Sequence, residues 1–310
     1  MSAEPRHILS ARQFDRGELE RLFRDADQLR ADLENPRTFG EFSDYLKDRL
    51  LFNIFYEPST RTRMSFAAAA EYLGMRVVST ESAQEFTANA KGEVLEDTIR
   101  VINQYQPAAI VMRHHEAGAA ETAASVSSVP IINAGDGSGE HPTQSLLDLY
   151  TIKRELGRLD DFNLLIGGDL AHGRTARSLA YLIALFDDIQ IVFVSPKSLT
   201  IDNEIKAYLD EHDVAYTETT ELEGPLGEAD VVYWTRLQTE RHAKPVKQNE
   251  YQIDRSMMRR LKKDAVLMHP LPRVDEISAE ADADPRAAYF RQAGNGLFIR
   301  MALLDWVCRS

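Results

Sequence analysis

The stretch Phe55-Tyr56-Glu57-Pro58-Ser59-Thr60-Arg61-Thr62-Arg63 joins a short apolar run, residues 50–56, to an alanine-rich run that ends at residue 73. The first run is β-prone, and in the second the apolar residues recur at helical spacing. Pro58 favours an extended backbone at the residue before it, Ser59 is a good helix N-cap, and Gly74 stands where the helix would end. The stretch therefore predicts a strand, a tight turn and a helix.

The start of this helix is a predicted anion-binding site. Unpaired backbone N–H groups and the positive end of the helix dipole attract a phosphate or a carboxylate there. Acidic side chains are preferred in a first helical turn, so Arg61 and Arg63 are unfavourable unless an external anion supplies the negative charge. The alternative is a capped surface helix with exposed arginines.

Composition limits the class of protein. A chain of 310 residues, 44% hydrophobic, can bury a sizeable core in one large or two medium domains. We expect no membrane partner and a cytoplasmic location, because no run is long enough to span a bilayer and the charged residues 1–7 do not resemble a signal peptide. The single cysteine, Cys308, excludes an internal disulfide and fits a reducing compartment. The net charge of −13 argues against nucleic acid as a partner.

Short apolar segments alternate with amphipathic segments along the chain, which indicates βαβ units and parallel sheets. The predicted strands are residues 50–56, 75–78, 108–113, 129–134, 162–166, 189–194, 230–234 and 265–268. The predicted helices are residues 15–33, 60–73, 92–105, 117–125, one that opens at 141–144, 173–186, 202–211, 255–261 and 296–309. The glycine-rich loop 135–139 marks the passage between two lobes of similar size, residues 1–140 and 141–294. The predicted fold class is therefore α/β, with a parallel sheet flanked by helices in each lobe.

Candidate site residues fall at the carboxyl ends of the predicted strands, where open parallel sheets bind ligands. They are Ser59, Thr60, Arg61, Thr62, Arg113, His141, Arg174, the residues 235–238 and the residues 269–272. Taken alone, Arg113 could be a surface charge and His141 a neighbour of a helix cap, but scattered surface charges would not recur at strand ends. His114 and His115 are adjacent, so their side chains point apart in an extended segment, and we predict no metal site.

The segment Gly168-Asp169-Leu170-Ala171-His172-Gly173-Arg174-Thr175 is nearly a nucleotide-binding P-loop. It has arginine where that motif needs lysine, and a planar guanidinium does not replace a flexible ammonium simply. The glycine spacing of a dinucleotide-binding fold is also missing after Ile166. Both alternatives are therefore disfavoured.

Several segments resemble, in the same order, those of the aspartate/ornithine carbamoyltransferase family. They are residues 55–63, 111–114, 141–144, 168–175 and 269–276. The resemblance runs from about residue 5 to the last helix and implies that the segment 295–310 returns to the first lobe. The runs Thr-Arg-Leu-Gln-Thr-Glu-Arg (235–241) and His-Pro-Leu-Pro-Arg (269–273) are similar to aspartate-specific members. Ornithine-specific members usually carry His-Cys-Leu-Pro and an acidic residue for the ornithine amine, and neither is visible here.

The resemblance implies a carbamoyl phosphate site in the first lobe. Its phosphate ligands would be Ser59, Thr60, Arg61 and Thr62. Thr62, Arg113 and His141 would polarise the carbonyl oxygen, and Gln144 with Leu271 and Pro272 would lie near the carbamoyl amide. The residues implied to act in catalysis are Arg61, Thr62, Arg113 and His141.

The resemblance also implies an aspartate site in the second lobe. Arg174, Arg236 and Gln238 would bind the two carboxylates of aspartate, and Glu57 would brace the arginines. Lys91 would enter from a neighbouring subunit together with Thr87, a position where aspartate-specific members commonly have serine.

The implied reaction moves the carbamoyl group of carbamoyl phosphate to the amine of L-aspartate, giving N-carbamoyl-L-aspartate and phosphate in pyrimidine biosynthesis. It needs no cofactor and no nucleophilic side chain, because the amine itself attacks and phosphate leaves. The implied partners are the other subunits of a homotrimer with shared sites and a possible separate regulatory chain. Two alternatives stay open: transfer to ornithine or another amine, and a non-catalytic homologue that binds only an anion or a partner.

Overall fold

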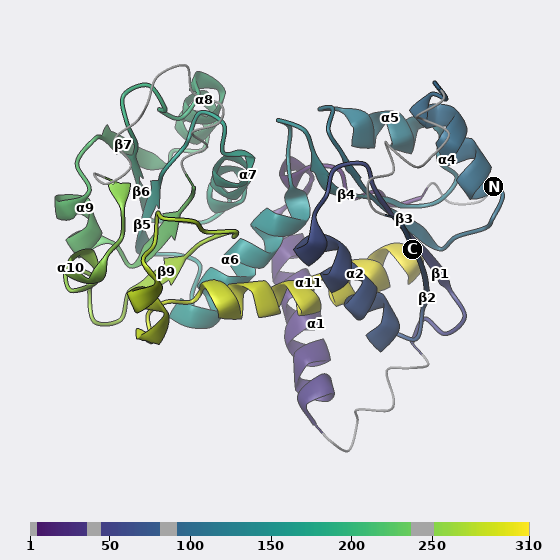
Figure 1. Cartoon of the computed structure of the whole chain (residues 1–310). Coiled ribbons are helices and arrows are strands. Elements are labelled where there is room, and N and C mark those ends of the chain that lie inside the picture. The colour runs from purple at the N-terminus through teal and green to yellow at the C-terminus, as the bar shows by residue number, and fades with distance from the viewer. Residues whose placement is uncertain (1–4, 36–44, 81–91, 237–250, 310) are drawn as a thin grey trace. The chain divides into compact units, whose positions relative to one another are not determined.

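The computed structural model describes residues 5–35, 45–80, 92–236 and 251–309. The chain divides into two compact units, which Figure 1 colours mainly purple to teal and teal to yellow-green along the sequence. Unit 1 contains residues 1–144 and 296–310, and unit 2 contains residues 145–295. Both junctions fall inside helices, α6 (Pro142–Leu156) and α11 (Tyr289–Arg309). The chain therefore enters unit 2 within a helix, a few residues after the boundary expected from the sequence.

Unit 1 is built on a four-stranded parallel sheet with the strand order β2-β1-β3-β4. Its strands are β1 (Leu50–Phe55), β2 (Arg76–Thr80), β3 (Ala109–His114) and β4 (Ile131–Asp136). Its helices are η1 (Ala11–Gln13), α1 (Arg16–Glu34), α2 (Thr60–Tyr72), α4 (Leu95–Asn103) and α5 (Ala119–Val126). The strand, turn and helix predicted over residues 50–73 are confirmed.

Both faces of this sheet are covered, which is why its central strands are almost continuously apolar. On one face Ile54 and Ile110 pack with Ile99 of α4 in a buried cluster that also contains residues of α5. On the other face the Asn53 side chain donates to the Arg63 carbonyl of α2 (3.4 Å). Figure 1 shows α4 and α5 on one side of these strands and α2 on the other.

Unit 2 is built on a five-stranded parallel sheet with the strand order β7-β6-β5-β8-β9. Its strands are β5 (Phe162–Gly167), β6 (Ile189–Val194), β7 (Ala215–Thr219), β8 (Val231–Trp234) and β9 (Val266–Met268). Its helices are α7 (Arg174–Ile183), α8 (Asn203–Glu211), α9 (Glu223–Glu228), α10 (Arg255–Met258) and η6 (Ala279–Ala283). Strand β7 and helix α9 were not predicted. The two parallel sheets flanked by helices confirm the predicted fold class.

Strand β8 divides the core of unit 2 by the alternation of its side chains. Val232 and Trp234 join a buried cluster with Leu226 of α9 and Met258 of α10. The intervening Tyr233 points to the opposite face and donates to Asp148 of α6 (2.7 Å). One face of the sheet therefore packs on this mainly apolar cluster, and the other contains the buried Tyr233–Asp148 hydrogen bond.

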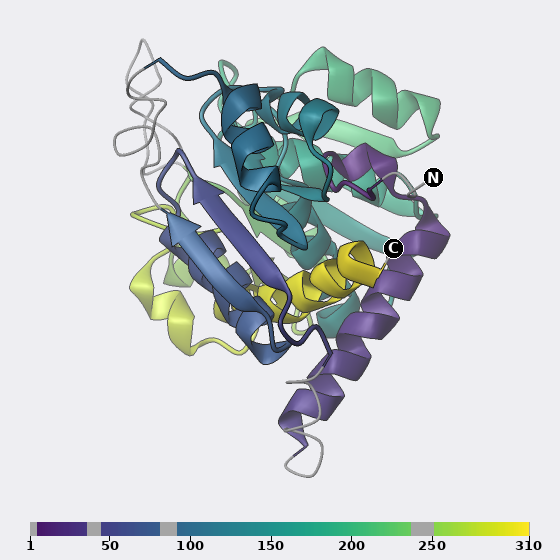
Figure 2. The same ribbon diagram turned by 90° about the vertical axis from the view of Figure 1, so that its right-hand side faces the viewer.

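The last two thirds of α11 belong to unit 1, as the family resemblance implies for the last helix. Arg30 of α1 lies over the ring of Phe298 (4.0 Å), and the Trp306 indole donates to Asp25 (2.7 Å). Figure 2 shows this part of α11, in yellow, beside α1, in purple. None of the helices that the structure describes combines the length and apolar character needed to cross a membrane.

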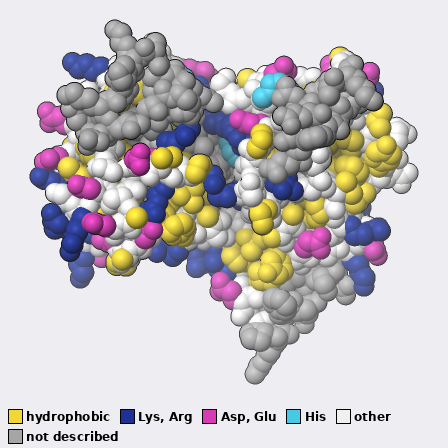
Figure 3. Space-filling view, in the orientation of Figure 1, with side chains coloured by type: hydrophobic (Ala, Val, Ile, Leu, Met, Phe, Trp, Pro, Cys, Tyr) yellow, Lys and Arg dark blue, Asp and Glu magenta, His cyan; other side chains and the backbone are white. Residues whose placement is uncertain are grey.

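Large apolar side chains remain exposed on unit 1. Met64 of α2 is 60% exposed, Val101 of α4 is 48% exposed, and Tyr105 just after α4 is 59% exposed. Figure 3 shows apolar surface over both of these helices. Apolar side chains that are exposed singly are normal on protein surfaces.

Candidate active site

The sheet of unit 1 changes direction between β1 and β3. The connection from β1 leads to β2 on one side, and β3 lies on the other side of β1. Such a switch point is where open parallel sheets bind ligands. Phe55 of β1 pairs with Arg113 of β3, and the Tyr56 amide donates to the Arg113 carbonyl (2.8 Å). The register therefore sets the turn before α2 beside Arg113.

The start of α2 has the features of an anion site. Ser59 occupies the N-cap position, but its side chain makes no capping hydrogen bond, and the first turn contains no acidic residue. Thr60 and Arg61 are exposed, whereas Thr62 is buried. Because helix geometry leaves the first amides of a helix without partners inside it, this turn presents N–H donors, hydroxyls and a guanidinium together.

Arg113 is fixed by two contacts within unit 1. Its Nη2 lies 2.7 Å from Oε2 of Glu57, and its Nη1 donates to the Ala134 carbonyl (3.2 Å). The Arg113 side chain is only 11% exposed. Its orientation is therefore set by the end of β4 and by the turn after β1.

His141 is buried directly before α6 and also belongs to unit 1. Its Nδ1 lies 3.4 Å from the Thr143 hydroxyl, and its carbonyl accepts from the Gln144 amide (2.9 Å). The preceding loop is tied down by Asp136, which accepts from the Glu140 and Gly118 amides (2.8 and 2.9 Å). His141 and Gln144 are thus presented by a rigid loop and the first turn of a helix.

Unit 2 has its own switch point, between β5 and β8. Gly167 ends β5, Gly168 follows it, and Arg174 begins helix α7. Gly168 has a φ of +109°, and a Cβ there would lie 2.2 Å from the Thr235 carbonyl oxygen, so only glycine fits. This close approach of two strand ends brings the segment before Arg174 beside the segment that carries Arg236.

The turn after β9 carries Leu271 and Pro272. The Leu271 amide donates to Nδ1 of the buried His269 (2.8 Å), whose Nε2 lies 2.8 Å from Oε1 of Glu276. Leu271 has a φ of +56°, which is uncommon for a side chain of this kind and needs a surrounding structure that holds it. His269 provides part of that support.

Three predicted residues, Lys91, Gln238 and Thr87, lie outside the described residues. The structure brings together Ser59 to Thr62 with Arg113 in unit 1, and the loops of Arg174 and Arg236 in unit 2. Two buried polar side chains, Asp148 and Gln292, were not among the predicted residues. The available signal was the presence of polar residues on otherwise apolar helices.

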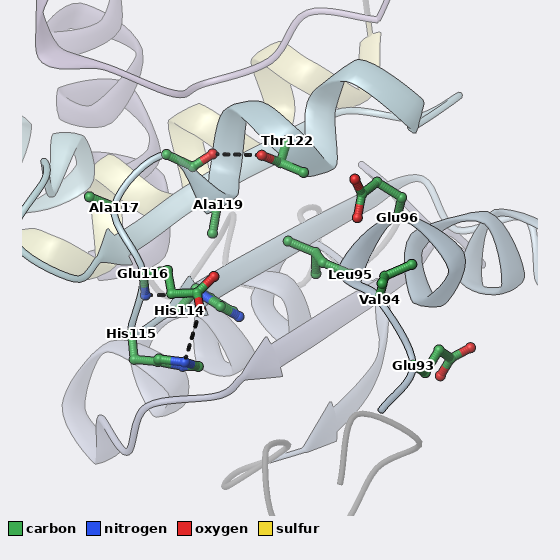
Figure 4. A pocket seen from close by; sticks show the side chains of 11 residues that line it. Glu93, Val94, Leu95, Glu96, His114, His115, Glu116, Ala117, Ala119 and Thr122 are labelled. Carbon is green, nitrogen blue, oxygen red and sulfur yellow. Dashed lines mark hydrogen bonds and ion pairs between the residues drawn. The ribbon is translucent and has the colours of Figure 1, made fainter. Parts of the chain in front are cut away.

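A separate cavity of about 610 Å³ lies between the start of α4, the end of β3 and the start of α5. Figure 4 shows His114, His115 and Glu116 at its wall, and none of the predicted ligands lines it. Burial and then the neighbouring His115 lower the pKa of His114, whose Nδ1 accepts from the Glu116 amide (3.1 Å). The described residues contain no group of three or more His, Cys, Asp or Glu side chains placed to hold a metal ion.

Comparison with known proteins shows to which family this architecture belongs. Residues 6–154 match the carbamoyl phosphate-binding domain of aspartate/ornithine carbamoyltransferases, and residues 160–307 match their aspartate/ornithine-binding domain. The chain belongs to the aspartate/ornithine carbamoyltransferase family. The resemblance stated from the sequence motifs is thereby confirmed.

Individual members of the aspartate/ornithine carbamoyltransferase family match over nearly the whole chain. The chloroplastic aspartate carbamoyltransferase of Arabidopsis thaliana is 49% identical, over 96% of this chain and 76% of the plant protein. The solved catalytic subunit of the aspartate transcarbamoylase of M. jannaschii is 40% identical, covers 98% of both chains and has a TM-score of 0.90. The Trypanosoma cruzi enzyme, solved with carbamoyl phosphate and aspartate, is 38% identical over 98% of this chain and 96% of the other, with a TM-score of 0.89.

Proposed function

We propose that this chain is an enzyme that transfers the carbamoyl group of carbamoyl phosphate to the amine of L-aspartate. The products are N-carbamoyl-L-aspartate and phosphate, and the reaction belongs to pyrimidine biosynthesis. The observation that carries the proposal is the combination of two switch points, each with arginines at its strand ends, in a chain 49% identical to an aspartate carbamoyltransferase.

Carbamoyl phosphate binds, in this proposal, to the residues of unit 1. Its phosphate takes the amides and side chains of Ser59, Thr60, Arg61 and Thr62 at the start of α2. This assignment is supported by the absence of acidic residues from that helical turn and by the Ser59 side chain, which makes no capping bond. Gln144 of unit 1 lies near the carbamoyl amide, and the family resemblance adds the backbone of Leu271 and Pro272, which belong to unit 2.

The chemical step in this proposal is an attack of the aspartate nitrogen on the carbonyl carbon. A new N–C bond forms, the C–O bond to phosphate breaks, and the departing phosphate takes the proton of the amine. Thr62, Arg113 and His141 stabilise the negative charge that develops on the carbonyl oxygen. Preorganised donors of this kind are usually the largest contribution to acyl transfer, and the two contacts that fix Arg113 support its role.

L-Aspartate binds through its two carboxylates to Arg174, Arg236 and Gln238. A guanidinium presents parallel N–H donors, a geometry that suits a carboxylate. Because the reactants are held rather than activated by a covalent intermediate, positioning supplies much of the rate, ~7–11 kcal/mol in favourable cases. No cofactor is part of this mechanism.

The proposal includes a homotrimer in which Lys91 and Thr87 reach the site of a neighbouring subunit. This part of the proposal comes from the family resemblance. A cytoplasmic location is also part of the proposal, and the family resemblance leaves open whether a separate regulatory chain binds the trimer. Among the relatives, the Arabidopsis protein is named chloroplastic, so location differs within the family.

The test is an assay of carbamoyl transfer from carbamoyl phosphate, run in parallel with L-aspartate and with L-ornithine at low and high salt. We expect carbamoyl-aspartate alone. Carbamoyl-ornithine would keep the anion site of unit 1 but overturn the assignment of the second substrate. Absence of both products from folded protein would favour a homologue that only binds an anion or a partner.

A further inference from the structure

A buried hydrogen-bond chain in unit 2 centres on Asp148 of α6. Its Oδ2 accepts from the Tyr233 hydroxyl (2.7 Å), and its Oδ1 accepts from Nε2 of Gln292 (2.6 Å). Asp148 and Tyr233 are 0% exposed and Gln292 is 1% exposed. A buried carboxylate is tolerated only with such partners, so the positions of α6, β8 and α11 around it are coupled.

The hydrogen-bond chain continues from Gln292 to the turn after β9. The Gln292 Oε1 accepts from the His269 amide (2.9 Å), and His269 Nδ1 accepts from the Leu271 amide (2.8 Å). Since Nδ1 is an acceptor, the ring proton of neutral His269 is on Nε2, where it is donated to Glu276. The second oxygen of Glu276 accepts from the Val274 and Asp275 amides (3.0 and 3.1 Å). The amides of this turn are therefore bound by His269 and by its partner Glu276, and Gln292 binds the His269 backbone.

The other end of the hydrogen-bond chain lies near the two segments of unit 2 that carry Arg174 and Arg236. The Thr175 side chain hydrogen-bonds the Tyr233 hydroxyl, and Thr175 follows Arg174 directly. Tyr233 lies in β8, the strand that leads to Thr235 and Arg236. Hydrogen bonds thus link the segment of Arg174, strand β8 before Arg236 and the Leu271 turn.

We infer that Asp148 and Gln292 are positioning residues, which hold the Leu271 turn and the arginine-bearing strand ends of unit 2 in one productive arrangement. The inference rests on the proposed function, because that function gives these segments their roles. Neither side chain needs to touch a substrate. When the Asp148–Gln292 bond is lost, Gln292 no longer holds the His269 amide. The His269 ring, which accepts from the Leu271 amide, is then also less firmly held.

The same two helices provide a matched control. One turn further along, Asn295 of α11 donates to the Thr151 hydroxyl of α6 (2.9 Å), and both residues are buried. This bond also joins α6 to α11, and its acceptor, Thr151, lies on α6 and not on the Leu271 turn. The variants Gln292→Met and Asn295→Leu therefore each remove one buried bond between the helices, and only the first disconnects the turn.

The experiment compares these two variants with the unmodified full-length protein. In Gln292→Met we expect kcat with aspartate to fall by about 10–100-fold, since a small misplacement can have an effect of that size. The dissociation constant for inorganic phosphate, which unit 1 binds in the proposal, stays within about twofold of the parent value. The reason is that the hydrogen-bond chain lies in unit 2. Hydrogen–deuterium exchange of the peptide 269–276 becomes faster. In Asn295→Leu, kcat and this exchange stay within about threefold of the parent, although both variants unfold at lower temperature.

Exchanging the carboxylate of Asp148 and the amide of Gln292 tests the hydrogen bond between them without shortening either side chain. Gln292→Glu alone sets two carboxylates against each other and lowers kcat. The double variant Asp148→Asn with Gln292→Glu exchanges donor and acceptor in this bond and keeps one carboxylate in the pair, so it restores kcat. Equal losses in Gln292→Met and Asn295→Leu, or no recovery in the folded double variant, would overturn the inference. An unmodified protein that lacks carbamoyl transfer would instead overturn the proposed function.

Discussion

Glu57 and Arg113 form an ion pair across the end of the unit 1 sheet, with Oε2 and Nη2 2.7 Å apart. The sequence analysis assigned Glu57 to the aspartate-binding arginines, but here it contacts the arginine proposed to stabilise the carbonyl oxygen. The pair arises because β1 and β3 are neighbours, with Phe55 opposite Arg113. A carboxylate beside an anion site orients the arginine and at the same time opposes the anion.

Replacing Glu57 by glutamine should separate these two effects. We expect inorganic phosphate to bind roughly threefold more tightly, because a negative charge near the anion is removed. Turnover should fall, because Arg113 loses the partner that orients it. Calorimetric titration of phosphate and the kcat for aspartate are the two measurements. Tighter phosphate binding together with unchanged turnover would show that Glu57 does not orient Arg113.

Arg113→Ala should reduce kcat by about 10²–10³-fold, the usual effect of losing one preorganised oxyanion donor. KM for carbamoyl phosphate should change much less, because the phosphate ligands at the start of α2 remain. Steady-state kinetics measures both quantities. The matched variant Arg63→Ala removes a guanidinium of α2, which donates to the Ser79 hydroxyl (3.3 Å). This variant should keep kcat within about threefold of the parent value.

His141→Asn tests whether the imidazole is a base or a hydrogen-bond donor. Loss of a general base typically lowers the rate by about 10²–10⁴-fold. We expect a decrease of no more than about tenfold, since asparagine can still donate and the departing phosphate takes the proton. The dependence of kcat on pH should keep its shape in this variant. Disappearance of its acid limb would instead assign base catalysis to His141.

Glu276 makes the stability of unit 2 sensitive to acid. Burial alone would raise the pKa of Glu276, but the hydrogen bond from His269 and those from backbone amides outweigh it, so the pKa lies below its ordinary value. A depressed carboxyl pKa contributes stability above the unfolded pKa of about 4.3, and that contribution is lost as the pH falls through the folded pKa.

Glu276→Gln should therefore destabilise the protein by ~1–3 kcal/mol at pH 7. The difference from the parent should shrink as the pH falls below about 4. Thermal unfolding between pH 7 and pH 3 measures both effects. A difference that is the same at every pH would mean that the Glu276 charge contributes nothing to stability.

Cys308 is expected to be an unreactive thiol. Burial raises the pKa of Cys308 to about 12, with a further rise from Asp305 and an opposing effect of Arg49. At pH 8 roughly one thiol in 10⁴ would then be the reactive thiolate. Because the chain has one cysteine, labelling with a chromogenic disulfide reagent reports on this site alone. Modification of the native protein should be slow and should become fast in denaturant, whereas Cys308→Ala should give no signal.

The elements with strong local signals could be predicted from the sequence. The β1 strand, the turn at Pro58 and helix α2 followed from apolar periodicity, a capping residue and Gly74, which has a φ of +80°. The placement of site residues at strand ends followed from the βαβ pattern alone. The assignment of each residue to a substrate came from the family resemblance and is still a prediction.

The missed elements lack these local signals. Strand β7 has no apolar alternation, since it is an edge strand whose residues are mostly exposed or half-buried. Helix α9 contains Pro225 and two glycines, which disfavour a helix in isolation. Helix α11 begins at Tyr289, earlier than predicted. Its first turns were missed because Gln292 and Asn295 are polar, yet they are buried by hydrogen bonds to α6. Those partners are 144 residues away in the sequence, beyond any local pattern.

The return of α11 to unit 1 has a consequence for folding during synthesis. Residues 296–310 belong to the same compact unit as residues 1–144, and Arg300 donates to Ser65 of α2 (2.9 Å). Domains usually fold in the order in which the ribosome makes them, the N-terminal one first. Here unit 2 is a continuous segment and emerges whole, while unit 1 waits for its last helix. The nascent chain would therefore complete its second unit before its first, with the turn before α2 among the last parts to become stable.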